Sequence, residues 1–301
     1  MDEYALGVLV NMGLFSFLAL SAYLLLVAGE MSFGQQAFFG VGAYAAGIGT
    51  AMWGLPLPIA ALLAMVLGAI AAWLVGLPTL RLRGLYFAMA TLAAAEMFRI
   101  LFELVRWQRE VEGDPVGPDG TQGFRGIRWV LEQGIDQAGY AAMVFALLAL
   151  VLAALFLAER SRLGATVRMV GEDPELAAVF GVDVGRVKLG VAAVAGALAA
   201  LGGALYAHHN TYIEPRNFDI MLGVHSLAYG LIGGLGTAFG PLVGVALDIG
   251  LLESTRAFQG YRMIVFGGLV AVLLIVRPRG LLDEAVVNRV RRALFARRGA
   301  R

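Results

Sequence analysis

Uninterrupted runs of apolar residues constrain the fold of this chain more than any other feature of its sequence. One helical crossing of a bilayer needs roughly 20 consecutive apolar residues. Because 59% of the 301 residues are hydrophobic and only 15% are charged, the chain has too little polar surface for a soluble globule of this length. We therefore predict an all-α polytopic membrane protein with about eight transmembrane crossings. The candidate crossings are residues 5–28, 34–52, 57–77, 84–104, 138–158, 189–209, 218–252 and 261–276.

The run over 218–252 differs from the others because glycines and a proline interrupt it. Irregular backbone at membrane depth is tolerated where it is buried or lines a cavity, so this break is a candidate part of a substrate path. Close helix packing is the alternative explanation, since glycines spaced four apart let helices approach to backbone contact. We predict two short helices joined by an irregular turn, which either span twice or re-enter from one side. The interrupting residues are Gly233, Gly234, Gly236, Gly240 and Pro241.

Basic residues predict the orientation in the membrane, because cytoplasmic loops are enriched in lysine and arginine. Three segments that would share one side hold most of them: Arg81 and Arg83, five residues in 159–188, and eight in 277–301. We predict that the N-terminus and the loop 105–137 lie outside. The segment 159–188 and the basic tail 277–301 would then lie in the cytoplasm.

The polar segment 159–188 contains a compact helix signal. Asp173 is a favourable N-cap, Pro174 fits the first helical position, and Gly181 can end the helix. We predict a helix over 174–180 with one small apolar face. A helix of two turns is unstable alone in water, so we expect this face to dock on a partner. The face consists of Leu176, Val179 and Phe180.

Few ionisable residues fall inside the apolar runs. Glu96, Arg99 and Glu103 lie at helical spacings on one face of the fourth run, which predicts an ion pair; direct contact with a substrate is the alternative. Asp248 stands alone in the broken run, where it either carries protons or bonds to a neighbouring helix. His208 and His209 are adjacent and would point in different directions from a helix, so we predict no metal site.

Enzyme signatures are missing from the sequence. It has no phosphate-binding loop, no nucleophile elbow and no zinc-protease motif, and it contains no cysteine. We therefore expect no catalytic residue and no cofactor in this chain. If ATP drives its function, a separate chain must hydrolyse it.

Several motifs, in order along the chain, resemble the permease family of branched-chain amino acid ABC importers, specifically the LivM type. The similarity covers most of the sequence. One motif, DPVGPDGTQG at 114–123, departs from the glycine-rich turn usual in the outer loop of that family. The motifs that carry the resemblance are SFGQQAFFGVGAY at 32–44, RGLYFAMATL at 83–92, SRLG at 161–164, GVDVGRVKL at 181–189, ALYA at 204–207, GGLGTAFGP at 233–241 and PRGL at 278–281.

The resemblance implies a permease subunit in a bacterial inner membrane, working by alternating access. The implied partners are a homologous LivH-type permease, two ABC ATPase subunits and a periplasmic substrate-binding protein, with no nucleic acid. The implied substrates are branched-chain or related amino acids, or else urea or short amides. A stand-alone secondary transporter or channel is the rival interpretation; it would need Glu96 or Asp248 to carry ions or protons.

The resemblance also suggests roles for particular residues. The capped helix would be the coupling helix that docks on an ATPase, formed by Asp173, Pro174, Glu175, Leu176, Ala177, Val179, Phe180 and Gly181. Polar or aromatic groups on helices of small residues have little reason to face lipid, so they are candidates for the substrate path. Together with two glycines of the break, these are Gln35, Phe38, Tyr44, Tyr86, Thr91, Gly234 and Gly236.

Overall fold

The computed structural model describes residues 3–111, 114–253, 261–277 and 280–282, and long helices dominate it. Every apolar run singled out in the sequence falls on one or two helices. Within the described residues, five helices are long and apolar enough to cross a membrane: α1 (Glu3–Val27), α3 (Leu57–Thr79), α4 (Leu85–Leu104), α6 (Gln137–Arg160) and α9 (Val184–Asn210). The shorter apolar helices are α2 (Gln35–Gly47), α10 (Ile220–Gly233), α11 (Gly240–Val245) and α12 (Arg262–Val276). Two of these continue as π-helical turns, α2 over Ile48–Met52 and α11 over Ala246–Glu253.

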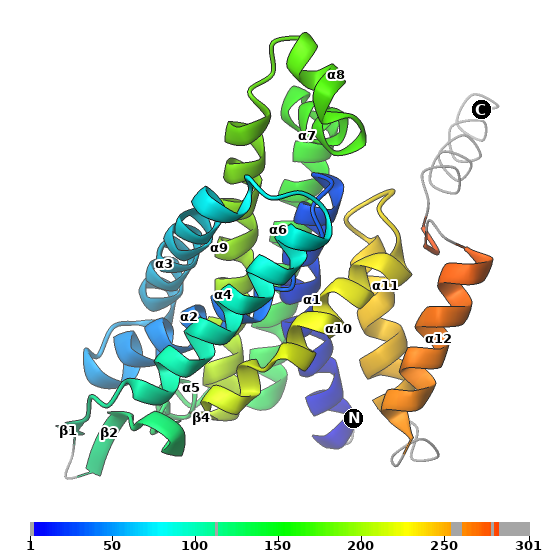
Figure 1. The fold of residues 1–301 in the computed structure, drawn as a ribbon. Helices are drawn as coiled ribbons and strands as arrows, with labels where there is room; N and C mark the ends of the chain where they lie inside the picture. The colour runs from blue at the N-terminus through cyan, green and yellow to red at the C-terminus, as the bar shows by residue number, and fades with distance from the viewer. Residues whose placement is uncertain (1–2, 112–113, 254–260, 278–279, 283–301) are drawn as a thin grey trace, which may run out of the picture.

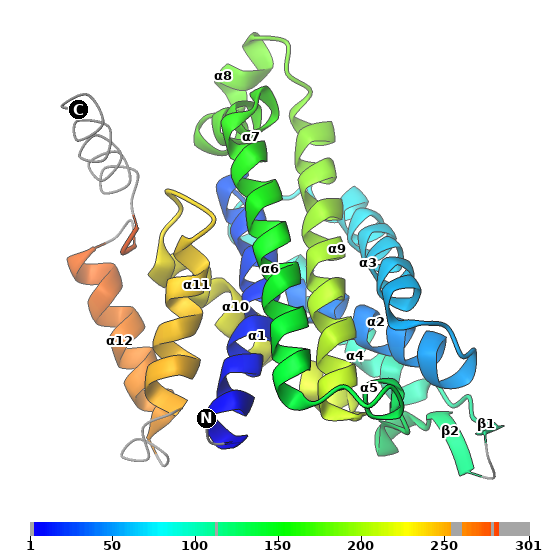
Figure 2. The ribbon, with the colours of Figure 1, turned by 180° about the vertical axis from the view of Figure 1, so that it is seen from behind.

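The two ends of the helix bundle carry different structures (Figures 1 and 2). At one end, the island end, α7 (Arg162–Glu172) and α8 (Pro174–Val179) project beyond the other helices. At the other, the sheet end, lie short strands, the helix α5 (Trp129–Glu132) and the start of α1. The polar segments 159–188 and 105–137 therefore lie at opposite ends of the molecule.

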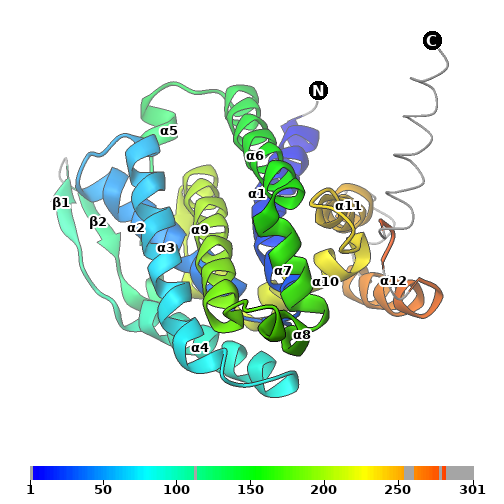
Figure 3. The same cartoon turned by 90° about the horizontal axis from the view of Figure 1, so that it is seen from above.

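Helix α9 forms the centre of the bundle, packed against α1, α2 and α3 (Figure 3). The α2–α9 crossing is made at backbone contact. A Cβ atom added to Gly203 would lie 1.8 Å from the carbonyl oxygen of Phe39, and one added to Gly42 would lie 2.0 Å from that of Ala200. Gly42 on α2 and Gly203 on α9 therefore serve tight helix packing.

The broken run forms the predicted pair of short helices, α10 and α11, joined by an irregular turn over 234–239. Gly233 and Gly240 bring the two helices together, since a Cβ on Gly233 would lie 1.9 Å from the carbonyl oxygen of Gly240. The turn lies at the island end of the bundle (Figure 1). Residues 280–282 bond to the end of α10 through Leu281 N to Ile232 O and Leu282 N to Gly233 O, both 2.9 Å.

The segment 105–137, predicted as an outer loop, contributes three strands to a small antiparallel sheet. Its strands are β1 (Arg109–Val111), β2 (Asp114–Pro118), β3 (Phe124–Arg125) and β4 (Tyr212–Ile213), in that order. Phe124 and Ile127 are fully buried and anchor this segment to the bundle. The all-α prediction omits this sheet because its strands are short and because β4 comes from a distant part of the sequence.

The polar segment 159–188 also holds more helix than the sequence indicated. The helix α7 precedes α8, separated from it only by Asp173. Of the basic tail predicted over 277–301, residues 278–279 and 283–301 lie outside the described residues, so the structure does not place them.

Candidate functional site

The short helix α8 is built by the caps that the sequence predicted. The Asp173 side chain accepts hydrogen bonds from the backbone N–H groups of Glu175 (3.0 Å) and Leu176 (2.9 Å). Gly181 closes the other end with φ of +81°, a conformation that favours glycine. The helix ends at Val179, one residue earlier than predicted, and Phe180 forms its C-cap.

The apolar face of α8 is exposed. Val179 is 82% exposed, Phe180 72% and Leu176 49%, whereas Ala177 is fully buried against the rest of the chain. The surface ion pair of Glu175 with Arg83, at 3.9 Å, joins two almost fully exposed side chains and contributes little. An exposed apolar cluster on a short, well-capped helix is typical of a surface that binds another protein.

The substrate-path candidates on α2 are buried inside the bundle. Gln35 is fully buried and accepts a short hydrogen bond from the Ser21 hydroxyl of α1. Tyr44 stacks on Phe102 of α4 with ring centroids 4.6 Å apart, and Phe38 meets Phe98 of α4 edge to face at 6.5 Å. These side chains hold α2 against α1 and α4.

The candidates on α4 lie on different faces. Thr91 is buried, donates to Ala88 O (2.9 Å) and accepts from Phe33 N (3.2 Å), so it fixes the corner before α2. Tyr86 is 70% exposed on the outer face of the bundle. The structure therefore places Thr91 in the bundle interior and Tyr86 on its surface.

Two buried polar atoms lack a hydrogen-bond partner within the described part of the chain, and both belong to α2. They are Gln36 Oε1 and the Tyr44 hydroxyl. Gln36 lies against Gly223 of α10, where an added Cβ would come within 2.2 Å of Gln36 Oε1. Unpaired buried polar groups are costly, so these two atoms on α2 are candidates for contact with water or substrate.

The charged residues of α4 form the predicted ion pair. Arg99 Nε donates to Glu96 Oε1 at 2.8 Å, and Arg99 Nη1 bonds to Glu103. The side chains of Glu96, Arg99 and Glu103 remain 34%, 21% and 29% exposed. This charged cluster therefore reaches the outer side of α4, a surface that would face lipid if no other protein covered it.

Other ionisable side chains within the bundle bond to neighbouring helices. Asp248 is fully buried and accepts a hydrogen bond of 2.7 Å from the Tyr229 hydroxyl. His208 Nε2 lies 2.9 Å from the Thr50 hydroxyl, and His209 stacks on Tyr140. Among the described residues, no group of three or more histidine, aspartate or glutamate side chains could hold a metal ion.

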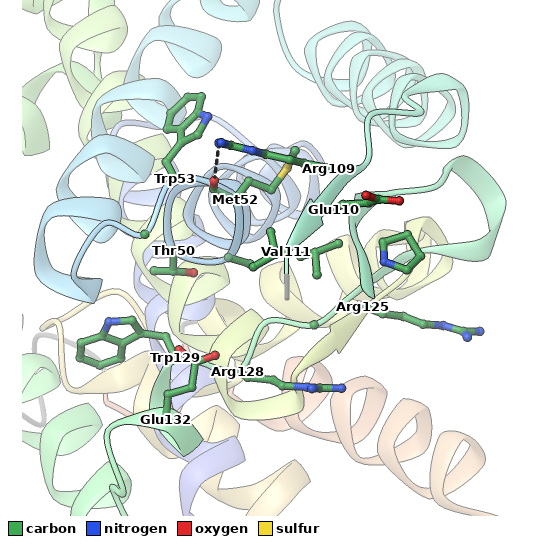
Figure 4. A pocket seen from close by; sticks show the side chains of 15 residues that line it. Thr50, Met52, Trp53, Arg109, Glu110, Val111, Arg125, Arg128, Trp129 and Glu132 are labelled. Atoms are coloured by element: carbon green, nitrogen blue, oxygen red, sulfur yellow. Dashed lines mark hydrogen bonds between the residues drawn. The ribbon is translucent and has the colours of Figure 1, made fainter. Parts of the chain in front are cut away.

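An open pocket of about 770 Å³ lies at the sheet end, between the start of the sheet and α5 (Figure 4). Trp53 and Arg109 line one side, and Arg109 Nη1 donates to Met52 O at 3.2 Å. Trp129 and Glu132 of α5 line the other side. Aromatic and charged side chains of both signs make this pocket a candidate recognition surface.

Comparison with known proteins resolves the family. The family model for the branched-chain amino acid transport system permease component matches residues 4–276. The chain belongs to this permease family. No solved structure matches it.

Curated relatives of this permease chain include both types of permease subunit. It is 30% identical over 280 residues to the high-affinity branched-chain amino acid transport system permease protein LivM of Escherichia coli K12, and 29% identical over 276 residues to LivM of Salmonella typhimurium. Each match covers 85% of this chain and 64% of the relative, so the permease chain spans less than two thirds of the LivM length. The permease protein LivH of E. coli K12 is 29% identical over 133 residues, 43% of this chain.

Sequence reasoning about the permease missed two features of the site. The first is α7, because its polar composition resembles a loop. The second is the pocket at the sheet end, although Trp129 and three arginines within the predicted outer loop were a signal for it. The resemblance to the LivM type is confirmed.

Proposed function

We propose that this chain is one permease subunit of an ATP-driven importer of branched-chain or related amino acids, working by alternating access. The observation that carries the proposal is α8, a capped helix that exposes Val179 and Phe180 beyond the bundle. Family membership supports the same conclusion, and the names of the LivM and LivH relatives supply the substrate class. Two ATPase subunits would supply the energy, and α8 would dock on one of them.

In this proposal the island end faces the cytoplasm of a bacterial cell and the sheet end faces outward. The N-terminus is then outside, 105–137 is the extracytoplasmic loop, 159–188 the coupling loop, and 277–301 a cytoplasmic tail. The α10–α11 pair, formed by the interrupted run 218–252, would enter the membrane and return to the same side. It is counted as one of the eight proposed crossings. With 14 residues, α10 extends roughly 21 Å, shorter than a bilayer core of about 30 Å.

A second, LivH-type permease subunit would cover the outer face of α4. The reason is the partly exposed cluster of Glu96, Arg99 and Glu103, because charged groups within a span seldom face lipid and instead meet protein or water. The substrate path would run between the two subunits along this face. Tyr86 would line it directly, whereas Gln35, Phe38, Tyr44 and Thr91 would support α4 from behind. Gly234 and Gly236 would act at its cytoplasmic end.

A periplasmic substrate-binding protein would dock at the sheet end. The pocket of about 770 Å³ between Trp53 and Trp129 supports this assignment, since aromatic and arginine side chains are enriched where proteins bind one another. The sheet would give this surface a fixed shape.

Reconstitution tests the proposal. We expect proteoliposomes that contain this chain, the second permease and the ATPase subunits to take up leucine, isoleucine or valine when ATP and the binding protein are supplied. Other amino acids, urea and acetamide in the same assay define the substrate. The chain alone should transport nothing under a proton or sodium gradient. Gradient-driven uptake by the chain alone would instead support a secondary transporter.

A further inference from the structure

Helix α7 contacts the tips of two helix hairpins at once. One tip is the α1–α2 corner, residues 28–34, and the other is the α10–α11 turn, residues 234–239. Both tips lie at the island end, next to the junction of α6 and α7 (Figures 1 and 3). Since α8 follows α7 after a single residue, any displacement of α8 is applied directly to α7.

Arg168 joins α7 to the α10–α11 turn. Its Nη1 atom donates to Leu235 O and its Nη2 atom to Gly236 O, both at 3.3 Å. A guanidinium group donates several hydrogen bonds in a fixed planar geometry, so it can hold two successive carbonyl groups of an irregular turn. Arg168 thereby binds backbone carbonyl groups that take no part in the hydrogen bonding within α10 or α11.

Glu159, at the end of α6, completes this connection. Its Oε1 atom accepts from the backbone N–H of Ala238 at 2.9 Å and from the Tyr23 hydroxyl of α1 at 2.6 Å. Arg168 Nη2 lies 3.9 Å from the same carboxylate, and the two side chains are only 24% and 19% exposed. The pair therefore links α1, α6, α7 and the turn through one largely buried charged cluster.

The α1–α2 corner meets α7 through backbone contact. A Cβ atom added to Gly171 would lie 2.1 Å from Val27 O, and one added to Gly29 would lie 2.8 Å from Gly171 O. The same corner is tied to the start of α9 by a buried ion pair, Lys188 Nζ to Glu30 Oε1 at 2.5 Å. Contacts this close transmit displacement, because packed backbones have no side chains between them that could absorb it.

We propose that α7 is the element that carries movement of α8 to both hairpin tips, with Glu159 and Arg168 as the positioning residues for that step. This inference rests on the proposed importer function and extends it. ATP-driven movement at α8 would shift α7 as a rigid piece, and the α10–α11 turn would follow because Arg168 and Glu159 hold it. Neither residue touches the substrate.

Uncoupling is the expected phenotype of the Arg168→Ala variant in the complete reconstituted complex. The ATPase subunits should stay bound and hydrolyse ATP, while uptake per ATP falls by about tenfold or more, in the range typical of coupling between sites. Arg168→Lys should recover part of the loss, since an ammonium group can reach one carbonyl. Arg81→Ala, an exposed arginine two residues after the end of α3, is the control and should keep the wild-type ratio.

Wild-type uptake per ATP in Arg168→Ala would overturn the inference while leaving the importer function intact. If the wild-type complex showed no ATP-driven uptake, the importer function itself would fail. If Arg168→Ala did not assemble, Glu159→Gln would decide the matter in the same assay. That variant keeps the side-chain size and an acceptor atom but removes the negative charge facing Arg168.

Spin-label distances provide a readout independent of activity. The chain contains no cysteine, so Ala165→Cys on α7 and Phe239→Cys at the end of the turn can be labelled selectively; both native side chains are exposed. We expect one narrow distance distribution between these labels, unchanged by ATP, and a broader one after Arg168→Ala. Separation of the two labels on ATP addition in the otherwise wild-type complex would contradict movement of α7 with the turn.

Discussion

Replacing Gly203 by alanine is expected to destabilise the protein strongly. The new Cβ would lie 1.8 Å from the carbonyl oxygen of Phe39 and 2.7 Å from its carbonyl carbon. Neither atom can move aside alone, because both belong to the backbone of α2. The α2–α9 crossing must open, and overpacking of this kind costs about 1–3 kcal/mol or more.

Gly190 provides a matched control on the same helix. Nothing lies within 4 Å of a Cβ added there, so Gly190→Ala should leave stability unchanged or raise it by up to about 1 kcal/mol through helix propensity. Thermal unfolding in detergent, read as the temperature at which monodisperse protein is lost, compares the two. Equal unfolding temperatures for Gly203→Ala and Gly190→Ala would mean that α2 and α9 do not cross at backbone contact.

Phe180→Asp is expected to weaken binding of the ATPase subunits by at least about 30-fold. Phe180 is 72% exposed, so the substitution removes no contact from the core and should not unfold the chain. In a complex its ring would fill an apolar groove. A charge buried there would reduce the binding free energy of the interface. Truncation of a central aromatic residue in an interface costs about 2 kcal/mol or more, which corresponds to a loss of at least about 30-fold in affinity.

Co-purification of the ATPase subunits with the tagged chain measures this loss. Leu131→Asp is the control, because Leu131 is 64% exposed on α5 at the opposite end of the molecule. It introduces the same charge in place of an exposed apolar side chain, and ATPase recovery should be normal. Full recovery with Phe180→Asp would show that α8 is not the docking element.

Local features of the chain were predictable from the sequence. The apolar runs became helices because a helix satisfies its own backbone hydrogen bonds in lipid, which depends on composition over about 20 residues. The N-cap of α8 was also predictable because it depends on residues near in sequence: the Asp173 side chain accepts from the backbone N–H groups two and three positions away. The Glu96–Arg99 pair likewise lies within one helix.

Features that depend on distant residues were not predictable. The sheet needs Phe124 to pair with Ile213, 89 positions later in the chain. Gln35 looked like a group lining a path because nothing in the sequence indicates that Ser21 of another helix lies beside it. Tyr86 illustrates a second kind of feature that the sequence does not predict. Periodicity separates the faces of a helix, but it does not tell whether lipid, water or a partner subunit covers the exposed face.

Labelling from one side of the membrane tests the central claim, that the island end meets the cytoplasm where a separate ATPase can reach it. Val179 and Leu131 are 82% and 64% exposed at opposite ends of a chain that has no native cysteine. In spheroplasts treated with a membrane-impermeant maleimide, Leu131→Cys should react at once, and Val179→Cys should react only after permeabilisation. Labelling of Val179→Cys in intact spheroplasts would contradict the account.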